Sequence, residues 1–178
     1  MNNEQINSNK KDRYLDILSS IKTDTDAVQF SSSLNKLAFS LYETRESINQ
    51  KISRFLSNEQ KDKIILYCKE HGINIDDIIS FQKFISELDA AVKNLPKITL
   101  FLAYEPRDES VSIISDWFIL NLKQKILLNI EVDKKIVGGA VIVYKGIYKN
   151  YSLKNKLDRM LSENKLNFNY LQTGEVNE

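Results

Sequence analysis

Large apolar residues recur at helical spacing through the first half of the chain. Positions three and four residues apart carry them, which is the pattern of helices that each bury one face. These positions are Tyr14, Leu15, Leu18 and Ile21; Ala27, Phe30, Leu34, Leu37, Ala38 and Leu41; Ile48, Ile52 and either Phe55 or Leu56; Ile64, Ile65, Tyr67 and Cys68; and Ile78, Phe81, Ile85, Leu88 and Val92. The pattern predicts five helices joined by short loops, which pack as a bundle.

Capping residues mark where several of these helices begin and end. Thr23–Asp26 supplies side chains that can accept hydrogen bonds from the first turn of the second helix. Ser57–Gln60 matches the capping box, with a hydroxyl at the cap and an amide three residues later. Gly72 favours a left-handed stop after the fourth helix because it lacks a Cβ. Either Asn74 or Asp76 can open the fifth helix.

The apolar period changes after Pro96, where alternation replaces helical spacing. In order, the sequence predicts a strand over 98–104, a helix over 111–122, strands over 126–132 and 140–144, a short return strand over 147–149 and a helix over 152–161. Lys145-Gly146 is the expected turn before the return strand.

These elements predict an α+β fold with two domains. An N-terminal all-α helical bundle is expected over 11–95, and a small β-α-β-β-α domain over 97–163. Residues 1–10 and 164–178 offer little to bury and are expected to be flexible tails.

Composition narrows the classes of function. Of the 178 residues, 25 are Lys or Arg and 24 are Asp or Glu, so the net charge of +1 gives no strong attraction to nucleic acid or anionic lipid. We see no secretory signal pattern in the polar first residues, and no apolar run approaches the ~20 residues that span a bilayer. The single Cys68 cannot form an internal disulfide, which favours a reducing compartment.

No constellation of reactive side chains is evident. His71 is the only histidine, and its place at a predicted helix end indicates a structural role. Cys68 is most simply a core residue, and no further ligands join the pair to make a zinc site. The Gly138-Gly139 pair leads into a strand and lacks the following Lys-Ser/Thr of a phosphate loop. We therefore expect no catalytic, cofactor or metal site.

Surface apolarity is the remaining candidate for function. Phe39 and Tyr42 lie off the main stripe of the second helix, and Phe81 and Phe84 widen the stripe of the fifth. A face this broad is consistent with a groove for a partner helix, or with a central helix buried on two sides. Trp117, on the predicted helix over 111–122, is expected in the core.

A sequence motif in the second half carries a family resemblance. A strand ends at Asp133, the pair Gly138-Gly139 follows, and after a second strand and a turn Ser152 opens a helix that bears Leu157. Taken singly, Asp133 suits a turn and the glycines a tight bend. In this order and spacing the residues resemble the delta subunit family of F-type ATP synthases, called the oligomycin-sensitivity-conferring protein in mitochondria. The length and the helical first half agree with the resemblance.

The resemblance implies a non-catalytic stator subunit without a cofactor. The N-terminal bundle would bind N-terminal helices of alpha subunits, and the C-terminal domain would hold the b-type peripheral stalk, so that proton flow is coupled to ATP synthesis. The protein would then lie at the cytoplasmic face of the cell membrane, attached only through its partners. The alternative is a free-standing adaptor module unrelated to ATP synthase. An enzyme or a nucleic-acid binder fits less well, because no nucleophile–base set is present and the charge is near neutral.

Overall fold

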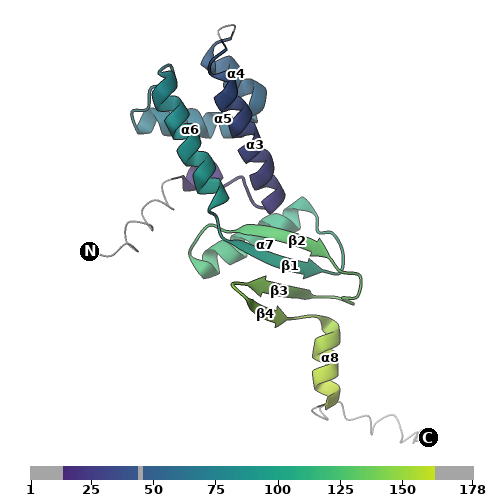
Figure 1. Ribbon diagram of the computed structural model, residues 1–178. Coiled ribbons are helices and arrows are strands. Elements are labelled where there is room, and N and C mark those ends of the chain that lie inside the picture. Colours follow the sequence, from purple (N-terminus) through teal and green to yellow (C-terminus); the bar gives the residue numbers. More distant parts are fainter. Residues whose placement is uncertain (1–13, 44–45, 163–178) are drawn as a thin grey trace, which may run out of the picture. The chain divides into compact units, whose positions relative to one another are not determined.

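The computed structural model describes residues 14–43 and 46–162, in an α+β fold in which a run of helices is followed by a small sheet with two further helices (Figure 1). The first elements are α2 (Leu15–Leu18), α3 (Asp24–Ser40), α4 (Ile48–Phe55), α5 (Asn58–Glu70) and α6 (Ile78–Lys93). They are followed by β1 (Lys97–Leu102), α7 (Asp108–Leu122), β2 (Leu127–Val132), β3 (Ala140–Tyr144), β4 (Ile147–Asn150) and α8 (Leu153–Ser162). The predicted fold class is confirmed, while the predicted tails 1–10 and 164–178 lie outside the described residues.

The chain divides into two compact units. Unit 1 contains the described residues up to Lys97 together with Arg107–Asn129, and unit 2 contains Ile98–Pro106 and the described residues from Ile130 onward. The sequence predicts one boundary near residue 96, which would place α7 in the C-terminal domain. By its contacts, α7 groups instead with the preceding helices.

Hydrogen bonds and an ion pair attach the segment around α7 to the helices of unit 1. Lys22, just before α3, donates from Nζ to Ser112 Oγ of α7 at 2.7 Å, and its carbonyl accepts from Leu128 N at 2.9 Å. Lys97 Nζ lies 2.6 Å from Asp24 Oδ1. These partners are far apart in the sequence, so hydrophobic periodicity could not reveal them.

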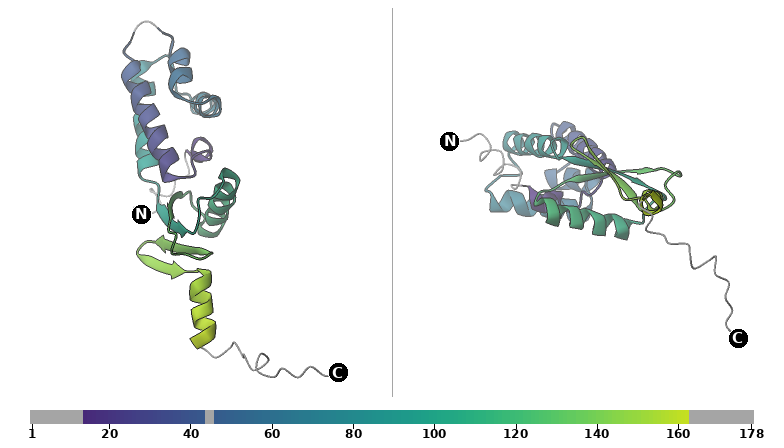
Figure 2. Two further views of the ribbon diagram at one scale, coloured as in Figure 1. Left: turned by 90° about the vertical axis from the view of Figure 1, so that its right-hand side faces the viewer. Right: turned by 90° about the horizontal axis from the view of Figure 1, so that it is seen from below.

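The core of unit 1 lies among the helices, with α3 and α6 side by side (Figures 1 and 2). Its buried members are those at the predicted helical spacing, including Phe30, Leu34, Leu37, Ile52, Ile64, Phe81, Ile85, Leu88 and Val92. The amphipathic patterns thus produced the expected inward faces, because burial of these side chains is the main favourable contribution to folding.

Helix ends follow local chemistry closely. Thr23, Ser47 and Ser57 each form a capping box, in which the cap side chain and the side chain three residues later exchange hydrogen bonds with the backbone. Gly72 has φ +66, the left-handed stop expected after α5. The cap of α6 is Asp77, which accepts from Ile79 N. The predicted openings at Asn74 or Asp76 were therefore wrong by one to three residues.

The four strands form one sheet in the order β2-β1-β3-β4. β3 pairs antiparallel with β1, where Leu100 faces Ile142, and with β4, where Tyr144 faces Ile147. Lys145 (φ 49) and Gly146 (φ +77) connect β3 to β4, with both central residues left-handed as in a type I′ turn. The predicted Lys145-Gly146 turn is confirmed. β1 ends at Leu102, two residues before the predicted end.

In the described part of the chain, every helix is too short or too polar to span a lipid bilayer.

Candidate functional site

The only histidine lies exposed at the end of α5, and the only cysteine is buried in the helical core. His71 ends α5, where its Nδ1 lies 2.9 Å from Tyr67 O and its ring stacks on Tyr67 at a centroid distance of 3.9 Å. Cys68 is fully buried, and burial raises the pKa of its thiol to about 11. A thiol with that pKa stays protonated at neutral pH and is a poor nucleophile and metal ligand. Within residues 14–43 and 46–162, no three His, Cys, Asp or Glu side chains are grouped to hold a metal ion.

An exposed apolar surface spans α3 and α6. Phe39 is 82% exposed and Tyr42 64% exposed, and Tyr42 Oη donates a hydrogen bond to Gln82 Oε1 of α6. Ile79, one turn before Gln82 on α6, is 80% exposed. We call Phe39, Tyr42, Ile79 and Gln82 the α3–α6 surface. Its three apolar side chains remain in water, which is the condition that favours docking of an apolar partner.

The other two residues predicted for this surface are in the core. Phe81 is 0% and Phe84 3% exposed, so they cannot contact a partner in this conformation, and that part of the predicted groove is wrong. Phe84 stacks on Phe81 and on Tyr67 of α5, at centroid distances of 6.0 and 5.4 Å. Their burial agrees with the alternative of a helix packed on two sides.

Sequence reasoning missed Ile79 as a member of the surface. It lies next to Ile78 but off the buried stripe that continues through Phe81 and Ile85. An apolar residue outside the stripe of an otherwise amphipathic helix was the available signal.

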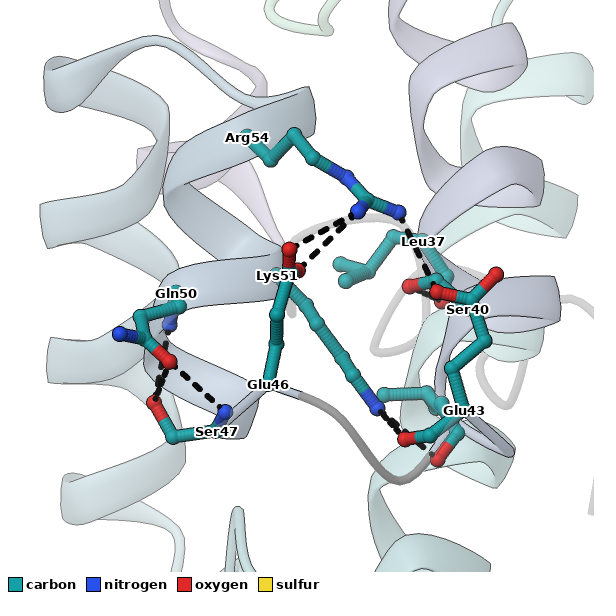
Figure 3. A network of polar contacts seen from close by, with 9 residues as sticks. Leu37, Ser40, Glu43, Glu46, Ser47, Gln50, Lys51 and Arg54 are labelled. Atoms are coloured by element: carbon teal, nitrogen blue, oxygen red, sulfur yellow. Dashed lines mark hydrogen bonds and ion pairs between the residues drawn. The ribbon is translucent and has the colours of Figure 1, made fainter.

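A buried lysine holds the end of α3 beside α4 (Figure 3). Lys51 is 2% exposed, and its Nζ donates to the carbonyl oxygens of Leu41, at 3.3 Å, and of Glu43. The Leu41 carbonyl belongs to the C-cap of α3 and the Glu43 carbonyl to the turn after it. A cation here satisfies both acceptors and also interacts favourably with the negative end of the helix dipole.

Arg54 adds exposed ion pairs to the same connection (Figure 3). Its guanidinium lies 3.1 Å from Glu46 and 3.5 Å from Glu43, on the two sides of the link between α3 and α4. Exposed ion pairs contribute little stability each. Together with Lys51, however, they position the segment that carries Tyr42, at one end of the α3–α6 surface.

In unit 2 the sequence motif joins two distant segments of backbone. Gly139 has φ +80, and a Cβ built on it would lie 2.3 Å from the carbonyl oxygen of Tyr151. On either side of this close approach, Tyr151 N donates to Ala140 O and Leu153 N donates to Gly138 O, each at 2.9 Å. Glycine is therefore required at position 139, because the backbone that enters α8 lies directly against it.

The remaining polar members of the motif shape the same region. Ser152 is 5% exposed and caps α8, where its Oγ accepts from Asn155 N at 3.3 Å. Asp133 Oδ1 accepts from Lys135 N at 2.9 Å, in the turn that follows β2. The motif residues thus shape the backbone and cap α8, and they present no reactive group at the surface.

Leu157 belongs to an unpartnered helix face. Leu153, Leu157 and Leu161 recur every four residues along α8 and are 47%, 44% and 50% exposed. No residue of α8 is buried, and the helix leads away from the β3–β4 hairpin (Figures 1 and 2). An amphipathic helix this short gains most of its stability from packing, so we call this leucine face the α8 stripe and regard it as a second candidate contact.

A shallow depression of about 300 Å³ lies beside the motif. Asp133, Lys135, Asn150, Ser152 and Lys154 contribute to its lining. The carboxylate of Asp133 and the hydroxyl of Ser152 are already hydrogen-bonded to backbone amides. The lining therefore presents no nucleophile beside a free base.

Comparison with known proteins gives a match over most of the chain. The family model described as "ATP synthase delta (OSCP) subunit" matches residues 6–163. This range includes both candidate contacts and the whole glycine motif.

Three curated relatives are each named "ATP synthase subunit delta". The chain is 26% identical over 143 residues to the one from Photorhabdus laumondii, covering 71% of this chain and 80% of that protein. It is 28% identical over 112 residues to the one from Rickettsia bellii, covering 63% and 56%. It is 23% identical over 175 residues to the one from Malacoplasma penetrans, covering 85% and 93%.

Proposed function

The chain belongs to the ATP synthase delta (OSCP) subunit family, and from that membership we propose that it is the non-catalytic stator subunit of an F-type ATP synthase. In this role it links the catalytic head to the peripheral stalk, so that the torque of rotation does not turn the head and proton flow stays coupled to ATP synthesis. It is peripheral to the membrane, on the cytoplasmic face, and reaches the membrane only through the complex.

Two exposed apolar contacts on different units support this proposal. The α3–α6 surface, centred on Phe39, Tyr42 and Ile79, suits an N-terminal helix of an alpha subunit. Val28, 63% exposed and about three turns before Phe39 on the same side of α3, lengthens the face along the helix axis. A docked helix would cover side chains that are now in water.

The α8 stripe suits the b-type peripheral stalk. Its leucines repeat at the spacing of a helix–helix contact, and Gly139 fixes the start of α8 against the sheet-bearing unit. A stator needs two binding surfaces in one chain. Once the first surface is bound, binding of the second is effectively intramolecular, which strengthens the attachment as a whole. The single observation that carries the proposal is this pair of unpartnered apolar faces in a member of the family.

The decisive experiment uses the holoenzyme. ATP synthase depleted of this chain and reconstituted into vesicles should lose proton-coupled ATP synthesis, and adding back the chain should restore it. The Phe39→Ser chain should restore coupling poorly. Leu66→Ser, which changes a residue 56% exposed on α5, is the matched control and should restore coupling fully. Coupled synthesis by the depleted enzyme would overturn the proposal.

A binding measurement separates the head contact from the stalk contact. A synthetic peptide of the alpha-subunit N-terminus should bind the wild-type and Leu66→Ser chains alike. We expect about tenfold weaker binding to Phe39→Ser, since truncating an exposed anchor residue at an interface typically costs more than 1 kcal/mol. Equal binding of the peptide by all three chains would show that the head contact does not use the α3–α6 surface.

A further inference from the structure

The outer side of α7 carries an apolar row that neither proposed contact uses. Ile113, Trp117 and Leu120 are 70%, 56% and 76% exposed, and their spacing places them on one side of the helix. The prediction that Trp117 lies in the core is therefore wrong. Its neighbour Phe118 is the buried aromatic, 8% exposed, and the two rings meet edge to face at 5.0 Å.

The apolar row is too large to be a scatter of single exposed residues. Three large side chains, one of them tryptophan, follow each other over two turns of the helix. Isolated exposed apolar residues are ordinary, but a contiguous row bordered by polar residues marks a contact surface. Tryptophan is also among the residues most enriched at the centre of protein interfaces.

Acidic side chains border this row along one side. On a helical projection Glu109 and Asp116 lie next to Ile113 and Leu120, while Asn121 lies beyond Trp117 on the other side. Both acids are exposed, and α7 contains no Lys or Arg between Asp108 and Leu122.

The nearby lysines do not cancel this acidic border. Lys125 interacts with Asp116, but its side chain is 7% exposed and leaves little positive charge at the surface. Lys22 Nζ donates to Ser112 Oγ, one turn before Asp116, on the side of the helix away from Trp117. Lys123 is exposed just after α7 and lies beyond Leu120, at one end of the row. Alongside Ile113 and Leu120 themselves, the surface combines an apolar centre with the negative edge of Glu109 and Asp116.

We propose that this outer face of α7 docks an amphipathic helix of a partner protein, with large apolar residues along one face and Lys or Arg along one edge of it. The row from Glu109 to Leu120 is about 16 Å long, which matches three turns of a partner helix. Basic residues of that helix would meet Glu109 and Asp116, while its apolar residues cover Trp117. An anionic membrane surface would be repelled by the same two acids. This contact goes beyond the stator proposal, since it uses residues outside both the α3–α6 surface and the α8 stripe.

Trp117 provides a site-specific reporter, because it is the only tryptophan of the 178 residues. The full chain is titrated with a synthetic amphipathic peptide of about five helical turns, with leucines on one face and lysines along the edges. Docking should shift the Trp117 emission to the blue and reduce its quenching by acrylamide. An otherwise identical peptide with glutamates in place of the lysines should bind at least tenfold more weakly.

Variants test the apolar centre and the acidic edge separately. Ile113→Ser and Leu120→Ser should each weaken the lysine peptide about tenfold, while Leu66→Ser on α5 should not. The double variant Glu109→Gln with Asp116→Asn should reduce both the affinity and its dependence on salt, because the screened charges are gone. Circular dichroism confirms that each variant keeps its helices.

Three results would overturn the proposal. One is a Trp117 that is already blue-shifted and protected from acrylamide in the free chain, which would mean that the chain itself covers the row. Another is equal binding of the lysine and glutamate peptides. The third is unchanged affinity of both serine variants. None of these results bears on coupling by the holoenzyme, so failure here is distinguishable from failure of the stator proposal.

Discussion

Replacement of Gly139 by alanine tests the central claim about the glycine motif. The new Cβ would lie 2.3 Å from Tyr151 O and 3.1 Å from Ser152 Cα, both parts of the backbone, so no side-chain rotation can relieve the contact. The backbone must separate, and the hydrogen bonds Tyr151 N to Ala140 O and Leu153 N to Gly138 O are stretched or lost. We expect the start of α8 to detach from the rest of unit 2.

The magnitude follows from two contributions. Holding an alanine at φ +80 costs about 1–2 kcal/mol. Losing the two hydrogen bonds costs about 1 kcal/mol each, so Gly139→Ala should destabilise this region by roughly 3–4 kcal/mol. Gly146→Ala is the matched control, because Gly146 has a similar φ of +77 but no atom within 4 Å of its added Cβ. Gly146→Ala should therefore lose only about 1–2 kcal/mol of stability, which comes from the left-handed backbone conformation.

Hydrogen exchange provides the local measurement. Exchange of the Tyr151 and Leu153 amides should accelerate more than tenfold in Gly139→Ala, since 1.4 kcal/mol corresponds to a factor of ten. In Gly146→Ala the same two amides should change far less, and urea unfolding should give the smaller loss of stability. If the two variants lose the same stability and exchange alike, the close approach is not what requires glycine at position 139.

Three further predictions concern lysines in unusual environments. Lys51→Met should lower the free energy of unfolding of the helical unit by about 1–3 kcal/mol in urea titrations, because two carbonyl acceptors at the end of α3 lose their donor; the exposed Lys69→Met should have almost no effect. Burial, with a further contribution from Lys22, lowers the pKa of Lys125 from 10.5 to about 8. Between pH 8 and pH 10.5 the unfolded chain therefore binds more protons than the folded chain, and the free energy of unfolding should rise with pH by up to about 3 kcal/mol. Lys125→Met should lack that rise and be more stable than wild type at pH 7, and parallel stability curves for the two chains between pH 7 and 10.5 would contradict the assignment. Lys145→Asn should stabilise the β3–β4 hairpin by several tenths of a kcal/mol in thermal unfolding, because asparagine tolerates a φ of +49 better than lysine; a lower melting temperature would refute the turn assignment.

Much of the fold could be predicted because its signals are local. The i, i+3, i+4 spacing of apolar residues placed the helices, and Ser57 and Gly72 marked the two ends of α5 through interactions within a few residues. The type I′ turn at Lys145-Gly146 follows equally from neighbouring residues. The family motif was recognisable for a related reason: the order and spacing of its residues reflect one backbone contact, between Gly139 and Tyr151.

Candidate contacts were harder to predict, because exposure depends on what packs against each face. Phe81 and Phe39 both extend the apolar faces of their helices, yet Phe81 is buried in the helical core and Phe39 lies in water. Trp117 was assigned to the core by residue type, whereas Phe118 occupies the inward position of α7. Periodicity finds a helix face but does not say how wide a sector its neighbours cover.

By itself the sequence determined the helices, the strands, most of their boundaries and the family of the chain, because each rests on side-chain size, polarity and order along the backbone. Only the tertiary structure decided that α7 packs with the preceding helices through Lys22, and that Gly139 is required by Tyr151. The structure alone also showed which apolar residues remain exposed to meet a partner. These outcomes depend on contacts between residues far apart in the chain, and such contacts leave no periodic trace in the segments that make them.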